Sequence, residues 1–143
     1  MKFLPLLFVP LIASCGFAAG TEAPRSERAQ TRLTRALEGK VAGPPQRCIS
    51  PFARNEQEIV DQRTILFKNG RNLVYRNDPE GGCQGLDQSR AIVVTSISGD
   101  YCRGDIIRVL DQTSGNLVGS CAFSDFIPYT APANPAEPVR NTP

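Results

Sequence analysis

The sequence has no histidine, no tryptophan and a single methionine among its 143 residues. Without histidine it cannot form a Ser-His-Asp or Cys-His nucleophile pair or a histidine metal site. It also lacks the one side chain that titrates near neutral pH without perturbation. These absences exclude most hydrolase mechanisms. An enzyme of this composition would have to use carboxylates, lysine or tyrosine.

The chain also lacks a large excess of either charge, because Lys and Arg number 16 and Asp and Glu number 14, a formal net charge of +2. Nucleic-acid-binding domains gather basic residues on one face, whereas here the basic residues are scattered singly, usually with an acidic neighbour. The composition therefore predicts a solvated surface of mixed charge and no nucleic-acid partner.

The apolar run at the N-terminus, Phe3 to Ile12, contains two prolines and is far shorter than the roughly 20 apolar residues that span a membrane. It follows Lys2 and precedes small residues, which is typical of a secretory signal peptide. Within it, Ile12-Ala13-Ser14-Cys15 resembles the processing site of bacterial lipoproteins, where a branched apolar residue and two small residues precede a cysteine.

That resemblance implies that residues 1–14 are removed and that Cys15 is acylated, which would anchor the protein in the lipid bilayer. Because Gly16 rather than aspartate follows the cysteine, it further implies the periplasmic face of the outer membrane. In the alternative, signal peptidase cleaves after Ala18 and leaves a soluble periplasmic or secreted protein. The complete match at Cys15 and the short apolar run favour the lipoprotein.

Residues 15–45 are small, polar and charged and form the predicted tether. A possible short helix covers 26–39, where apolar residues recur at i, i+4, i+7 and i+8: Ala29, Leu33, Ala36 and Leu37. This apolar stripe is thin, so both a helix packed on the domain and a frayed tether stay open. Gly43-Pro44-Pro45 stops any helix and predicts the domain boundary.

Residues 46–129 predict a mainly β domain. Asn69-Gly70, between 64–68 and 72–76, indicates a hairpin with a type I′ turn, in which both central residues need positive φ. The β-branched run Ala91–Ile97 predicts a central strand buried on both faces. Further strands are expected over 47–49, 105–110 and 117–123, and a helical turn over Asn55–Asp61.

About six antiparallel strands at this spacing predict a small barrel or sandwich. Residues 130–143 carry prolines at 132, 135, 138 and 143. Such a segment has few amide donors and little to bury, so a disordered tail is expected.

Besides Cys15, the cysteines are Cys48, Cys83, Cys102 and Cys121, all in the β domain. An exported chain meets an oxidising compartment, so they predict two disulfides. Zinc is disfavoured because no CxxC pair and no histidine is present, and no cofactor is predicted. Of the three possible pairings we favour Cys48–Cys121, which would close a barrel, together with Cys83–Cys102.

Several short segments occur in a distinctive order: Arg47-Cys48-Ile49, Asp61 before Thr64–Phe67, Cys83-Gln-Gly-Leu86, Tyr101-Cys-Arg-Gly-Asp105 and Gly119-Ser-Cys121. Over about residues 42–126 this order resembles a family of small proteobacterial envelope proteins, a domain of unknown function. The resemblance implies an exported, disulfide-bonded domain and supplies no activity, substrate or catalytic residue.

Two motifs have simpler explanations than binding. Arg103-Gly104-Asp105 spells the tripeptide that adhesion receptors recognise, but a turn glycine followed by a strand-opening aspartate explains it better. The oxygen-rich loop Asn77–Gly82, with Asp87, lacks the alternating spacing of a calcium loop and is better explained as a turn in which Asp78 bonds the backbone.

The functional expectation is a non-enzymatic binding or interaction module, held in the envelope by its acyl anchor, with an unidentified envelope protein or ligand as partner. The alternative is a small periplasmic enzyme that uses two converging carboxylates. Its candidates are Asp61, Asp100, Asp105 and Asp125. Turn or capping roles would account for each of them, so no catalytic residue is assigned.

Overall fold

In a computed structural model of the chain, the described residues are 24–54 and 56–132. The predicted signal peptide, Cys15 and all but the first three residues of the predicted tail lie outside them. The elements follow in the order α1 (Glu27–Leu37), β1 (Val41–Ala42), β2 (Cys48–Ile49), the 3₁₀ helix η1 (Pro51–Arg54), β3 (Glu56–Asp61), β4 (Thr64–Asn69), β5 (Leu73–Asn77), β6 (Arg90–Val94), β7 (Tyr101–Cys102), β8 (Ile106–Asp111), β9 (Leu117–Ala122) and β10 (Phe126–Thr130).

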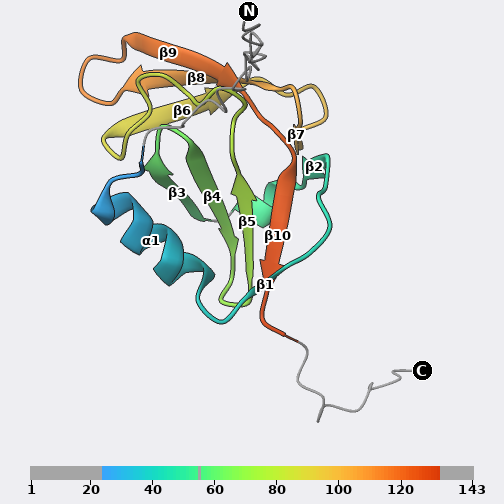
Figure 1. Cartoon of the computed structure of the whole chain (residues 1–143). Coiled ribbons are helices and arrows are strands. Elements are labelled where there is room, and N and C mark those ends of the chain that lie inside the picture. The colour runs from blue at the N-terminus through green and yellow to red at the C-terminus, as the bar shows by residue number, and fades with distance from the viewer. Residues whose placement is uncertain (1–23, 55, 133–143) are drawn as a thin grey trace, which may run out of the picture.

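The described strands form three antiparallel sheets (Figure 1). One has the order β1-β10-β5-β4-β3, a second has the order β6-β8-β9, and β2 pairs with β7. The sheets do not close into a barrel, and the arrangement is sandwich-like. The predicted mainly β class is thereby confirmed.

The main core lies between the five-stranded and three-stranded sheets. Phe67 of β4 is fully buried at its centre, with ring centroids of Tyr101, Phe123 and Phe126 at 5.9, 5.8 and 5.9 Å. Edge-to-face and tilted contacts of this kind add to the burial of apolar area. The remaining buried members are Ile49, Ala53, Ile59, Ile65, Cys83, Leu86, Ile107 and Val109.

A second, smaller core lies under α1. Ala29 and Leu33 are the buried residues of the helix, and they pack on Val60, Leu66 and Val74 of the five-stranded sheet. The Ser26 hydroxyl caps the helix by accepting a hydrogen bond from the Ala29 amide at 3.3 Å. The predicted short helix is therefore present and packs on the domain.

The folded unit begins well before the predicted boundary at Pro45. Besides α1, β1 joins the sheet, with Val41 opposite Thr130 and Ala42 opposite Tyr129 of β10. The described part of the expected tether is thus not a free linker. The thin apolar stripe suffices because the outer face of the sheet offers a complementary apolar surface, which is not visible in the helix sequence itself.

Residues 56–61 form strand β3 rather than the expected helical turn, whose first residue, Asn55, lies outside the described residues; the 3₁₀ helix η1 precedes it. β3 pairs with β4, and this pairing places Ile59 in the main core and Val60 under α1. Burial on alternate faces favours a strand over a turn. β10, an interior strand between β1 and β5, was not expected as a separate strand.

Two details of the predicted strands are wrong. In the β4–β5 hairpin Asn69 pairs with Leu73, and among the turn residues only Gly70 has a positive φ, so the turn is not type I′. The run from Ala91 contributes β6, an edge strand with Val93 46 % exposed, not a central strand buried on both faces. β-branched residues suit any strand, so their run does not reveal how many faces are covered.

Candidate functional site

The cysteines form two disulfides, Cys48–Cys102 and Cys83–Cys121. Disulfides are typical of oxidising compartments, so the chain is expected outside the cytoplasm. The number of bridges agrees with the sequence prediction, but the predicted pairing Cys48–Cys121 and Cys83–Cys102 is wrong.

The pairing follows from the sheet topology. Cys48 of β2 and Cys102 of β7 are direct partners in the two-stranded sheet, with Cα atoms 4.0 Å apart. Cys83 follows β5 and joins β9 through Cys121. The prediction assumed that 117–123 was the last strand and closed a barrel against the first, whereas β10 follows it and no barrel closes.

Arg103, Gly104 and Asp105 form the turn between β7 and β8. The Asp105 carboxylate accepts a hydrogen bond from the Cys102 amide at 2.8 Å, and Arg103 lies 3.0 Å from Asp125. The expected turn role is therefore confirmed for this tripeptide.

The four candidate carboxylates have separate roles. Asp61 pairs with Arg25, and Asp105 and Asp125 have the turn contacts described above. Asp100 lies half-buried in the loop before β7. Three of the four side chains, those of Asp61, Asp105 and Asp125, therefore have an ion-pair or turn contact of their own.

Several polar side chains in and around the loop after β5 form hydrogen bonds within the protein. Asn77 is fully buried, and its side-chain amide donates to the Ser124 carbonyl at 2.8 Å. Asp87 accepts hydrogen bonds from the amide and hydroxyl of Ser89. Asp78 bonds side chains rather than the expected backbone groups, and these contacts lead to a different site.

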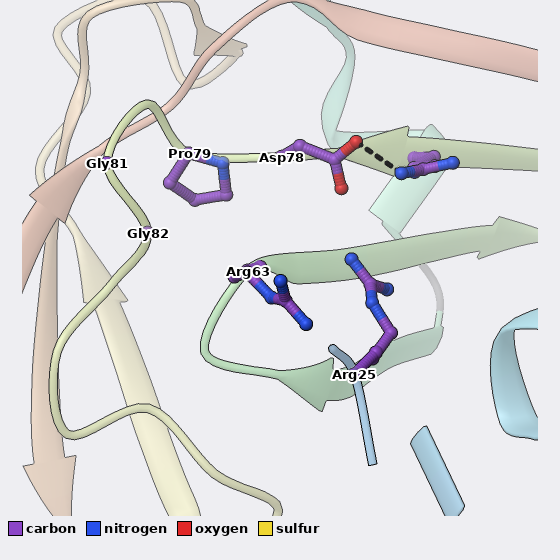
Figure 2. A pocket seen from close by; sticks show the side chains of 7 residues that line it. Arg25, Arg63, Asp78, Pro79, Gly81 and Gly82 are labelled. Atoms are coloured by element: carbon purple, nitrogen blue, oxygen red, sulfur yellow. Dashed lines mark ion pairs between the residues drawn. The ribbon is translucent and has the colours of Figure 1, made fainter. Parts of the chain in front are cut away.

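A pocket of about 450 Å³ lies where the segment before α1, the β3–β4 turn and the end of β5 meet (Figure 2). We call it the arginine pocket. It is lined by Arg25, Arg63, Arg76, Asp78, Pro79, Gly81 and Gly82. In Figure 2 the side chains of Arg25, Arg63 and Asp78 point toward a common space, and the loop with Gly81 and Gly82 lies beside it.

A polar network holds two of the three arginines, Arg25 and Arg76, in place. Arg25 Nη2 donates to Thr64 Oγ1 at 2.9 Å, and this hydroxyl donates to Asp78 Oδ1 at 2.5 Å. Arg76 Nη2 lies 2.7 Å from Asp78 Oδ2, and Arg25 Nε lies 3.2 Å from Asp61 Oδ2. Thr64 is fully buried in β4, so a rigid strand fixes the centre of the network.

The lining carries an excess of positive charge, since it contains three arginines and one aspartate. Two of these arginines are paired with carboxylates, Arg25 with Asp61 and Arg76 with Asp78. Burial disfavours the charged form of Arg76, but hydrogen bonding and charge attraction from Asp78, with a further contribution from Tyr129, outweigh it and raise the pKa of Arg76 above its ordinary value. Arg76 therefore stays cationic.

Two nitrogen atoms of the network, Arg25 Nη1 and Arg76 Nε, are buried without a hydrogen-bond partner among the described residues. An unsatisfied charged donor is costly, and such groups often mark a functional site. Chemically, the pocket is a set of fixed guanidinium donors. Within residues 24–54 and 56–132, no three Cys, Asp or Glu side chains cluster so as to hold a metal ion.

A larger hollow, about 630 Å³, lies over α1 but is lined by Arg25 and residues of the helix itself, from Glu27 to Glu38. Side chains of a single helix cannot surround a ligand, and no buried network supports them. The arginine pocket, which three segments build, is the better candidate site.

Sequence reasoning missed this site because its arginines are single residues at positions 25, 63 and 76. Their one linear signal is that Arg63 and Arg76 lie at the ends of the predicted hairpin strands, near the loop Asn77–Gly82. The segment before α1, which supplies Arg25, had been assigned to the tether, so nothing connected it to them.

A family of unknown function, DUF6491, matches residues 2–132. The chain belongs to this family. The expected resemblance to an uncharacterised family is thereby confirmed, and DUF6491 membership brings no activity or site residues with it. No curated protein and no solved structure shows significant similarity to the chain.

Proposed function

We propose that this protein is a non-enzymatic binding module of the bacterial cell envelope, anchored by acylation of Cys15 on the periplasmic face of the outer membrane. Its ligand site is the arginine pocket. The observation that carries this assignment is the network Asp61–Arg25–Thr64–Asp78–Arg76, which orders two guanidinium groups, from the segment before α1 and from β5, beside one recess.

Export is supported by the two disulfides and by the signal-peptide pattern of residues 1–14. None of the described helices is long and apolar enough to cross a membrane. Membrane attachment would therefore come from the lipid on Cys15, with the residues before Pro24 as a short link to the folded unit.

A binding role is supported over catalysis by what the pocket carboxylates do. Asp61 and Asp78 are each held by an arginine, and Asp78 also accepts the Thr64 hydroxyl proton in a hydrogen bond. In these contacts both carboxylates are acceptors that orient the guanidinium donors.

The anchor is tested by growing cells with radiolabelled palmitate. We expect label in the parent protein and none in Cys15→Ser. An unlabelled parent whose mature N-terminus is Ala19 would contradict the anchor and support cleavage after Ala18.

The ligand site is tested by native mass spectrometry of the full chain purified from envelopes. We expect a small molecule to remain bound to the parent and to be lost from Arg63→Gln. The matched control is Arg71→Gln, which removes the same charge from an exposed position in the β4–β5 turn. A bound mass that persists in Arg63→Gln, or none in the parent, would refute the assignment of the pocket.

A further inference from the structure

We infer that one flank of α1 is a docking surface for an anionic lipid bilayer. The surface consists of Arg28, Arg32 and Arg35, and we call it the basic stripe. This inference rests on the acyl anchor of the proposed function, which brings a bilayer close to α1. It does not depend on the arginine pocket.

The basic stripe is an open surface. Its three arginines lie at i, i+4 and i+7, so they project from one flank of the helix. Arg28 and Arg35 are exposed, and Arg32 is half-buried. Together with Glu27 and Thr31 they line a hollow of about 340 Å³. Because residues of a single helix cannot enclose a small molecule, the stripe suits an extended surface as its partner.

The stripe is not neutralised by the part of the chain that the structure describes. No ion pair between described residues includes any of its three arginines. Asp61 and Asp87 border the neighbouring hollow beside Arg28 and Arg32. These two carboxylates contact other arginines, Asp61 with Arg25 and Asp87 with Arg90. The guanidinium groups of the stripe therefore remain available to an outside anion.

The excess charge of the chain is concentrated in this segment. Residues 27–40 contain four basic and two acidic residues, and their net charge of +2 equals that of the whole chain. The other 12 basic and 12 acidic residues balance. The helix side of the fold thus carries a local positive charge, as an anionic partner requires.

The helix does not need these charges for its own stability. Arg28 and Arg32 are like charges at i and i+4, which repel each other. Arg28 also lies in the first turn, where the helix dipole disfavours a cation. Packing of Ala29 and Leu33 holds the helix on the sheet despite both effects. An anionic surface beside the stripe would relieve both.

The distance from the anchor selects a bilayer among anionic partners. Eight residues separate Cys15 from Pro24, the first described residue. At about 3.3–3.6 Å per residue, this segment spans at most about 30 Å. An acylated Cys15 would therefore keep α1, the first element of the fold, close to the lipid headgroups. Arginine side chains near an anionic bilayer are attracted to its surface.

The test uses the full chain purified from envelopes and placed in nanodiscs that contain a lipid with a paramagnetic headgroup. The discs are of phosphatidylcholine alone or of equal parts phosphatidylcholine and phosphatidylglycerol. NMR reporters are the amides of Thr31 and Thr34 on α1, with Gly104, across the fold in the turn after β7, as the reference (Figure 1). We expect the anionic discs to increase relaxation of the two α1 amides but not of Gly104, and high salt to reverse the increase.

The decisive variant is Arg28→Gln/Arg35→Gln. Its matched control is Arg47→Gln/Arg108→Gln, which removes the same charge from two exposed arginines elsewhere. Each variant is first shown to unfold like the parent in urea. Because each arginine contributes about fivefold, we expect the ratio of lipid-bound to free orientations to fall at least about tenfold in the first variant and not in the control. Arg28→Lys/Arg35→Lys should keep the effect, because an anionic surface needs charge rather than the guanidinium fork.

Relaxation that is equal in the two kinds of disc, or unchanged in Arg28→Gln/Arg35→Gln, would overturn the docking surface. A photo-crosslink from position 31 to an envelope protein, without any lipid effect, would also overturn it and indicate an acidic protein partner. If Cys15 proves not to be acylated, the anchor of the proposed function fails. The same charge dependence is then measured by co-sedimentation of the full chain with vesicles of the two compositions, and its absence there would overturn the surface as well.

Discussion

β4 and β8 are both interior strands of antiparallel sheets, yet they are buried in different ways. In β4, Thr64 to Phe67 are all fully buried. In β8, Ile107 and Val109 are fully buried, whereas Ile106 before them and Arg108 between them are exposed. The first strand lies between the main core and α1, and the second is covered on one face only by the described residues.

The difference shows how the helix creates the site. Because α1 covers the outer face of β4, a polar residue at its start, Thr64, is buried and must be hydrogen-bonded. Its partners are Arg25 and Asp78, and these orient the arginine pocket. On β8 the outward residues meet solvent and carry no such requirement. Because both faces of β4 are buried, Thr64 needs hydrogen-bond partners and lies at the centre of the polar network.

The largest expected contrast between the sheets comes from core truncation. Phe67→Ala removes the side chain that Tyr101, Phe123 and Phe126 surround, so we expect the free energy of unfolding to fall by about 3–5 kcal/mol. The matched Ile106→Ala, at a site 52 % exposed on β8, should cost less than about 1 kcal/mol. Urea unfolding measures both. Similar losses would mean that the outer face of β8 is covered.

How far the sequence predicts this fold depends on whether a signal is local. Strand positions and the helix could be predicted because each depends on the spacing of apolar residues within one short segment, as with Ala29 and Leu33. The sequence could not predict which strand is covered on both faces, because that depends on where α1 packs. The arginine pocket escaped for the same reason, since Arg25 and Arg76 meet only through Thr64 and Asp78 after the sheet has formed.

The two disulfides offer a second contrast. Cys48–Cys102 and Cys83–Cys121 close loops of similar length, with separations of 54 and 38 residues, so chain entropy gives each about 2–4 kcal/mol. Cys83 is fully buried in the main core, whereas Cys48 is exposed. We therefore expect the double alanine variant of the Cys83 bridge to unfold at lower urea than that of the Cys48 bridge. The reverse order would show that the β2–β7 pair contributes more to the fold than its burial suggests.

A smaller effect is expected where the three-stranded sheet meets the loop after β5. A Cβ on Gly119 of β9 would lie 1.9 Å from the Gln84 carbonyl oxygen, so Gly119→Ala must displace that backbone. Overpacking of this kind costs about 1–3 kcal/mol. At Gly115, with φ +71° but no atom within 4 Å of a Cβ, alanine has only the left-handed backbone conformation to oppose it, about 1 kcal/mol. Thermal unfolding should rank Gly119→Ala as the less stable variant, and the opposite ranking would contradict the close approach.

The smallest expected effect concerns the outer end of β8. The amide and hydroxyl of Ser114, followed by the Thr113 amide, donate to Asp111 and hold the pKa of its carboxyl below the ordinary value of 3.8. Because the pKa is lower in the folded state, the carboxylate stabilises the fold fully above pH 3.8, and this contribution is lost as the pH falls through the folded-state pKa. Asp111→Asn should therefore be slightly less stable than the parent at neutral pH, with the gap closing in acid.

Ser114→Ala separates the carboxylate from its hydroxyl donor. It keeps Asp111 and the backbone donors but removes one hydrogen bond, so the Asp111 pKa, followed by NMR of the side-chain carboxyl carbon, should rise toward its ordinary value without reaching it. A pKa unchanged in Ser114→Ala would assign the depression to the backbone amides of Ser114 and Thr113 and to the charge of Arg90. In that case the serine hydroxyl would not contribute to the pH dependence of stability at this end of the three-stranded sheet. The arginine pocket differs, because there side chains hold the charged groups in place.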